Sequence, residues 1–337
     1  MTGRALWLFS MNIAVTAIAT YCLVRWDDWI PIPDIPNHRS SHNRPKPRTG
    51  GIAILIGILA GFALWRVAHG NWSGLGDAAW ILSGGVAFFL LGLLDDLHHL
   101  PEWIRLLIEA SVSLIIAACG PRLLTLNLPG LSPWAMPVIL SVLVTAFWYT
   151  GFINLFNFMD GTDGLAAGEA ALVGFLMAIV GGGAWPLIVS ASALGFLFFN
   201  HQPSRIFMGD SGSYLLGFLL AVLSVIGCRT ASAHVVFQVF LLFQATFIID
   251  TTVTLARRIC FREDWFKAHR SHYYQKLSDL GWSHARIAWS NLGITACLGA
   301  SGIAYIHLPP VGQIILLTAW STAFGAGILL IHHYEAS

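Results

Sequence analysis

Long apolar runs alternate with short polar segments along almost the whole chain. A membrane-spanning helix needs roughly 20 predominantly apolar residues, and the pattern predicts ten or eleven such spans. We expect them at about 5 to 24, 50 to 68, 79 to 94, 104 to 120, 135 to 153, 164 to 182, 185 to 200, 213 to 228, 234 to 256, 287 to 306 and 311 to 332. Residues 1–337 are therefore expected to form a single all-α domain, a polytopic transmembrane helical bundle.

The composition supports a membrane protein. Of the 337 residues 56% are hydrophobic and 10% are charged, with a mean hydropathy of +0.69, whereas soluble domains carry about 25% charged residues. The net charge of +1 gives no basic field for nucleic acid. Five scattered cysteines without a C-x-x-C pair predict neither disulfides nor zinc. The first apolar run is too long for a signal-peptide core, so we expect it to remain as a helix.

The charged residues are distributed unevenly between the two sides. With eleven spans, fourteen of the eighteen Lys and Arg residues lie on one side, in or directly beside the loops at about 25–49, 95–103, 154–163, 201–212 and 257–286. The positive-inside rule makes these loops cytoplasmic, with the N-terminus periplasmic and the C-terminus cytoplasmic. Almost every acid lies on the same face, at helix ends. A transporter with inverted repeats would instead place polar residues near mid-membrane.

The first cytoplasmic loop is basic and precedes a helix. Arg44, Lys46 and Arg48 lie just before Gly50 and Gly51, which open the next apolar run. Basic side chains beside a helix N-terminus suit a phosphate, because free N–H groups and the helix dipole favour an anion. The alternative is a positive-inside anchor that touches only lipid headgroups.

The fifth loop is basic and aromatic. His269, Arg270 and His272 follow Trp265 and Phe266. Arg and His beside aromatic rings are suited to holding a diphosphate and stacking on a base or sugar. An amphipathic helix lying on anionic lipid would give the same composition.

The second loop begins with two adjacent acids, Asp95 and Asp96, directly after an apolar run. Like charges near hydrocarbon repel each other and lose solvation, so the pair requires a metal, a basic partner or a shared proton. A solvated pair at a helix end is the alternative. His98 and His99 follow without recognisable metal-ligand spacing, and we interpret them as interfacial.

The third and fourth loops carry oxygen ligands. In the stretch that begins at Asn154, the side chains of Asn157, Asp160 and Asp163 recur every three residues, so they can share one side of a helical turn. Asp210 lies in Met-Gly-Asp-Ser-Gly-Ser before another helix. Hard oxygen donors favour magnesium or manganese over zinc. A helix-terminating turn and an Asp N-cap are the alternatives.

Four motifs in this order resemble the polyprenyl-phosphate N-acetylhexosamine-1-phosphate transferase superfamily. They are Leu-Asp-Asp at 94–96, Asn-Phe-Met-Asp-Gly-Thr-Asp-Gly at 157–164, Met-Gly-Asp-Ser-Gly-Ser at 208–213 and Arg-Ser-His at 270–272. By position, the resemblance implies catalytic roles for Asp95, Asp96, Asp160, Asp163 and His272. It implies substrate binding by Arg44, Lys46, Arg48, Asn154, Asp163, Arg270 and His269, and Mg²⁺ (or Mn²⁺) binding by Asn157 and Asp210.

The resemblance also indicates a subfamily. Where the peptidoglycan translocase has three histidines, this chain has His272-Tyr-Tyr-Gln, which argues against that enzyme. Arg-Ser-Ser-His at 39–42 looks closest to the WbpL-type O-antigen initiators, which use N-acetylated deoxyhexosamines such as FucNAc or QuiNAc.

The resemblance implies a reaction as well. The chain would transfer an N-acetylhexosamine-1-phosphate from a UDP-sugar to undecaprenyl or another polyprenyl phosphate and release UMP, at the cytoplasmic face of the bacterial inner membrane. This would be the first membrane step of O-antigen or another cell-surface polysaccharide. The alternatives are the same reaction with UDP-GlcNAc and, from a different class, an anionic-lipid transporter. Whether the chain forms a homodimer is left open.

Overall fold

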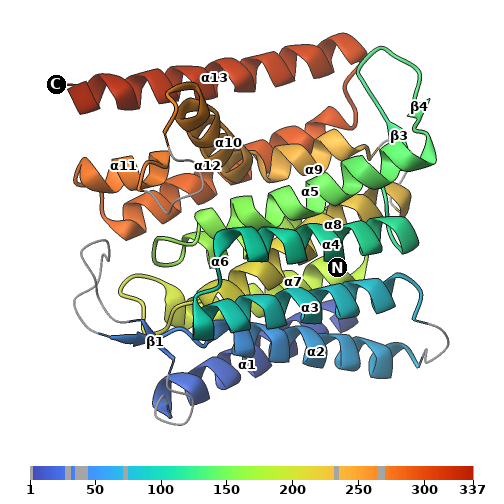
Figure 1. Cartoon of the computed structure of the whole chain (residues 1–337). Helices are drawn as coiled ribbons and strands as arrows, with labels where there is room; N and C mark the ends of the chain where they lie inside the picture. The colour runs from blue at the N-terminus through green and yellow to red at the C-terminus, as the bar shows by residue number, and fades with distance from the viewer. Residues whose placement is uncertain are drawn as a thin grey trace.

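The computed structural model describes residues 3–26, 32–34, 45–70, 75–230, 235–263 and 270–336, and they are almost entirely helical (Figure 1). The helices are α1 (Gly3–Arg25), α2 (Gly50–His69), α3 (Asp77–His98), α4 (Glu102–Cys119), α5 (Val138–Phe158), α6 (Leu165–Ile179), α7 (Ala184–Asn200), α8 (Gly209–Thr230), α9 (Phe237–Phe243), α10 (Ala245–Cys260), α11 (Tyr273–Asp279), α12 (His284–Tyr305) and α13 (Pro310–Ala336). Two antiparallel ladders pair β1 (Pro33–Asp34) with β2 (Lys46–Pro47) and β3 (Thr125–Leu126) with β4 (Trp134–Ala135).

The helices match the apolar runs closely. Ten of the eleven expected segments each contain one helix. Within the described residues, seven helices are long and apolar enough to cross a membrane, or eight if the bent pair α9 and α10 counts as one. Helices α6 and α7 are shorter, with 15 and 17 residues. The chain is thus a polytopic helical membrane protein, as expected, while the number of crossings and their direction stay predictions.

The expected span at 234–256 is wrong as a single helix. The chain bends by 80° between α9 and α10, at Gln244. The Gln244 side chain is buried, and its amide donates to the Ser224 hydroxyl at 3.0 Å and to the Phe240 carbonyl at 2.9 Å. Burying an amide requires such partners, and here α8 supplies one of them beside the bend.

Helix α8 forms the centre of the bundle. Its apolar stretch is 94% buried inside the protein, far more than that of any other candidate span in the described chain. Close approach depends on small residues: a Cβ at Gly92 of α3 would lie 2.3 Å from the carbonyl oxygen of Asp210 at the start of α8. Helices α3 and α5 pack against α8, and Figure 1 shows the three axes running roughly along the same direction.

The polar loops gather at one end of the bundle. In Figure 1, β1 and α11 lie at one end of the helices, and β3 and β4 lie at the opposite end. The α11 segment contacts the end of α5 directly, because the Tyr274 hydroxyl donates to the Phe158 carbonyl at 3.0 Å. Helix α11 and the two small ladders were not predicted, since they are short elements inside polar loops.

Candidate active site

The carboxylate of Asp96 at the end of α3 caps the start of α8. Its oxygens accept the backbone N–H groups of Asp210 at 2.9 Å and Ser211 at 3.0 Å. Free N–H groups at a helix N-terminus favour a negative charge. Gly209 permits the tight turn before them, with a φ of +72° and with Asp96 Oδ2 only 2.7 Å from where a Cβ would lie. Asp96 is thereby fixed and buried.

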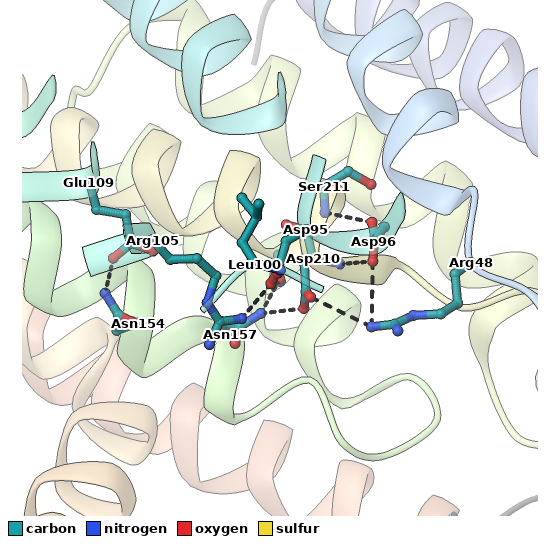
Figure 2. A network of polar contacts seen from close by, with 11 residues as sticks. Arg48, Asp95, Asp96, Leu100, Arg105, Glu109, Asn154, Asn157, Asp210 and Ser211 are labelled. Atoms are coloured by element: carbon teal, nitrogen blue, oxygen red, sulfur yellow. Dashed lines mark hydrogen bonds and ion pairs between the residues drawn. The ribbon is translucent and has the colours of Figure 1, made fainter. Parts of the chain in front are cut away.

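One guanidinium lies between two carboxylates. An Arg48 nitrogen is 3.4 Å from Asp96 Oδ1 and 3.7 Å from Asp210 Oδ2 (Figure 2). The Arg48 backbone is held in place because its neighbours pair with the loop before α8: Phe207 donates to the Pro47 carbonyl at 2.9 Å, and Gly50 donates to Phe207 at 3.0 Å. The Arg48 side chain is 25% exposed, so a ligand can still reach it.

Asp95 has different partners from its neighbour. It accepts the Leu100 N–H at 2.8 Å and forms an ion pair with Arg105 of α4. One turn further along α4, the fully buried Glu109 accepts the amide of Asn154 (Figure 2). Sequence reasoning missed Arg105 and Glu109. Two charged residues inside the apolar run at 104–120 were the available signal, because such residues inside a membrane segment usually carry a function.

Asn157 and Asp210 lie together, as the resemblance implied, whereas α5 ends at Phe158, so Asn157, Asp160 and Asp163 do not share one helical turn. The Asn157 amide is 2.8 Å from Asp210 Oδ1 and 2.8 Å from the Ser213 hydroxyl. Asp160, on the turn after α5, is half-buried. Burial, and then the negative charge of Asp210, raise the pKa of the Asp160 carboxyl well above its usual range.

These donors fit a hard divalent cation. In the described part of the chain no three His, Cys, Asp or Glu side chains form a metal-binding cluster. Magnesium, however, is usually held by one or two carboxylates together with phosphate oxygens and water. Asp210 with the Asn157 carboxamide, beside further acids, offers such a partial set and an excess of negative charge.

A second polar group surrounds Asp163. Its carboxylate accepts the Ser204 N–H at 3.0 Å and the Ser204 hydroxyl at 2.9 Å, and the Lys46 ammonium donates to that hydroxyl at 2.8 Å. His284, at the start of α12, lies 3.7 Å away. Burial alone would raise the pKa of Asp163, but hydrogen bonds from His284 and Ser204 lower it to about 2. The carboxylate is therefore ionised throughout the ordinary pH range.

His272 is oriented by an acid that sequence reasoning also missed. Asp250 of α10 lies 3.2 Å from His272 Nδ1 and accepts the N–H groups of Tyr273 at 3.0 Å and Tyr274 at 2.9 Å. His272 is buried, with its ring 5.7 Å from that of Phe158. An acid inside the apolar run at 234–256 was again the available signal.

The structure does not bring every expected residue together. Arg270 is exposed and pairs with Asp279 at 3.5 Å. Arg44, His269 and the Arg-Ser-Ser-His stretch at 39–42 lie outside the described residues.

Comparison with known proteins gives a consistent result. The profile of glycosyl transferase family 4 matches residues 78–228. A "probable undecaprenyl-phosphate N-acetylglucosaminyl 1-phosphate transferase" of Bacillus subtilis is 32% identical over 284 residues, which cover 82% of this chain and 78% of that protein.

Two further relatives carry related names. A "decaprenyl-phosphate N-acetylglucosaminephosphotransferase" of Mycobacterium leprae is 27% identical over 83% of this chain and 79% of its own length. A "phospho-N-acetylmuramoyl-pentapeptide-transferase" of Lactiplantibacillus plantarum is 30% identical over 75% of this chain and 82% of its own length.

Proposed function

Because the chain belongs to glycosyl transferase family 4, we propose that it transfers an N-acetylhexosamine-1-phosphate from a UDP-sugar to a polyprenyl phosphate. The relatives support a sugar-1-phosphate transferase, and their names supply the polyprenyl carrier. One observation in the structure carries the proposal: Arg48, Asp96, Asn157 and Asp210, from four separate parts of the chain, meet at the start of one helix.

The reaction forms one phosphorus–oxygen bond and breaks another. An oxygen of the carrier phosphate attacks the β-phosphorus, which bears the sugar. The bond from this phosphorus to the bridging oxygen breaks, and that oxygen leaves with UMP. The sugar C1–O bond stays intact, so the anomeric configuration is kept. A phosphate monoester loses its second proton near pH 6, so the carrier is largely a dianion at neutral pH and needs no general base.

The residues of the site act by position and charge. Arg48 can neutralise a phosphate oxygen. Asp96 fixes the Arg48 guanidinium by an ion pair at 3.4 Å. Asp95 holds Arg105 close to the same place. Phosphoryl transfer depends mainly on such positioning and charge stabilisation. The contacts support positioning roles for both adjacent acids, since each already accepts a backbone N–H.

Asp210 and Asn157 would hold the magnesium ion. When bound, it would supply charge neutralisation for the donor diphosphate. Asp163, Ser204 and Lys46 come from three different loops and contact one another, and we assign this group to the nucleotide part of the donor.

There are two candidates for the sugar that is transferred. The names of the Bacillus and Mycobacterium relatives favour UDP-GlcNAc, whereas the Arg-Ser-Ser-His stretch favours a deoxyhexosamine such as FucNAc or QuiNAc and an O-antigen pathway. A cytoplasmic-face site in a bacterial inner membrane suits both, because UDP-sugars are water-soluble.

One assay tests the function and the sugar together. Purified protein is incubated with undecaprenyl phosphate, magnesium and each of several radiolabelled UDP-N-acetylhexosamines. We expect label in the lipid extract and equimolar UMP, with one sugar clearly preferred. Label that never enters the lipid, with any sugar, would refute the transferase and leave the transporter alternative.

A further inference from the structure

A buried carboxylate joins three helices beneath the candidate active site. Glu169 of α6 is 1% exposed. It accepts the Thr246 hydroxyl of α10 at 2.9 Å, and from α12 it accepts the Thr295 hydroxyl at 2.9 Å and the Asn291 amide at 2.9 Å. In the described part of the chain no Lys, Arg or His side chain interacts with the Glu169 carboxyl group. An acid buried among neutral donors is costly to keep, so its place in the bundle needs an explanation.

Glu169 binds α10 directly beside the bend between α9 and α10. Thr246 lies in the first turn of α10, two residues after Gln244, where α9 and α10 meet at 80°. The hydrogen bond from Thr246 therefore fastens the start of α10 to α6, while the hydrogen bond from Gln244 ties the other side of the bend to α8.

Helix α10 connects this anchor to the active site along one face. Thr246 and Asp250 are four residues apart, and residues at this spacing share a face of a helix. Asp250 holds His272 and the first N–H groups of α11, and Arg258 donates to the Ser271 hydroxyl at 3.4 Å. Asp250 lies only about 6 Å along the axis from Thr246, so a shift at the anchor moves the His272 segment.

The segment at the start of α11 contacts the turn at 157–164, which carries candidate site residues. The Tyr274 hydroxyl donates to the Phe158 carbonyl, and a Cβ at Gly161 would lie 2.2 Å from that hydroxyl. Helix α6, which carries Glu169, starts directly after the same turn. Glu169 therefore ties the helix that leaves the turn to the helix that holds His272 against it.

We propose that Glu169 is a positioning residue, which fixes the bend between α9 and α10 and thereby the place of Asp250 and His272 against the turn at 157–164. The proposal rests on the proposed transferase function for its kinetic part. Its structural part can be tested without turnover.

The structural test is hydrogen exchange in the purified full-length protein. We expect Glu169→Ala to speed the exchange of the Tyr273 and Tyr274 amides, which donate to Asp250. Asn12→Ala is the matched control, because Asn12 is also buried and donates to the Ile188 carbonyl and the Ser192 hydroxyl, between α1 and α7. Unchanged exchange at Tyr273 and Tyr274 in Glu169→Ala, or equal acceleration in the control, would overturn the proposal.

The kinetic test is a double-mutant cycle with His272→Ala. Glu169→Ala should lower kcat on the order of 10-fold to 10²-fold, as misplacement does, and Glu169→Gln should recover most of it. In the His272→Ala background the further loss should fall below about 3-fold, because the residue through which Glu169 acts is gone. A merely structural loss would multiply equally in both backgrounds, as expected for Asn12→Ala. If wild-type protein turned over no UDP-sugar, the proposed function would fail, and hydrogen exchange would still decide the role of Glu169.

Discussion

At the scale of single residues, two acids that are neighbours in the sequence have separate tasks. Asp96 caps α8 and faces Arg48, whereas Asp95 accepts Leu100 and pairs with Arg105. Neither carboxylate is free of donors, as a general base would be. The pair that sequence reasoning treated as one unit therefore has two separate sets of partners, and each acid is bound to a different arginine.

Replacing Asp96 distinguishes between two roles for this residue, positioning and proton removal. We expect Asp96→Asn to lower the transfer rate on the order of 10²-fold or more, because an amide cannot accept both N–H groups and neutralise Arg48 as well. The loss should be nearly constant from pH 7 to 9. If Asp96 were instead a base, the variant would recover as the carrier phosphate ionises near pH 6, and recovery above about pH 8 would contradict the positioning role.

The low pKa of Asp163 predicts how the stability of the protein depends on pH. Its pKa is lowered to about 2, so its contribution is present above the unfolded value near 4 and is lost as pH falls through about 2. A shift of this size corresponds to about 2 kcal/mol. Asp163→Asn should therefore lower the melting temperature at pH 7, and the gap to wild type should narrow below pH 4. A gap that did not depend on pH would contradict the assigned ion pair and hydrogen bonds.

At the scale of elements, the apolar runs predicted nearly all the helices, because length and composition alone decide what a membrane helix requires. The bend at Gln244 was not predictable in this way. The segment 234–256 contains neither Gly nor Pro, which cause most sharp kinks. The residues at the break instead have buried partners in α8 and α6, which are distant in sequence.

The same limit applies to the candidate site. The family resemblance indicated Asn157 and Asp210, whose side chains do meet. Asp250 and Glu169 escaped notice because each was interpreted as part of an apolar helix, and Arg105 was counted only as one of the basic residues of the cytoplasmic side. Only tertiary packing places them beside polar groups.

The contact between α3 and α8 gives a prediction at this scale. Gly92→Ala places a methyl group 2.3 Å from the Asp210 carbonyl oxygen, which is backbone and cannot rotate away. Helix α8 must then move relative to Asp96, and we expect at least about a 10-fold loss of transfer activity. Gly151→Ala of α5 is the control, since nothing lies within 4 Å of its Cβ. Equal activities of the two variants would contradict the need for close packing at the site.

At the scale of the whole molecule, contacts place the chemical loops at one end of the bundle. Arg48 contacts Asp210, Lys46 contacts Ser204, and Tyr274 contacts Phe158. At the opposite end Asp77 pairs with Arg229. The start of α9 lies there too, because the Gln238 amide donates to the Asn127 carbonyl. The bent pair α9 and α10 therefore connects the two ends, as the expected straight span would have done.

This arrangement makes the membrane orientation testable with reporter fusions. Fusions after Arg48, Arg205 and Lys276 should all report the cytoplasm, and fusions after Asn71 and Arg122 should report the periplasm, because most basic residues lie in the first set of loops. The fusion after Lys276 is decisive, since it follows the bend. If α9 and α10 returned to the side on which α8 ends, that reporter would appear outside while the one after Arg48 stayed inside. His272 and Asp210 would then face opposite sides of the membrane, and the site could not assemble from both.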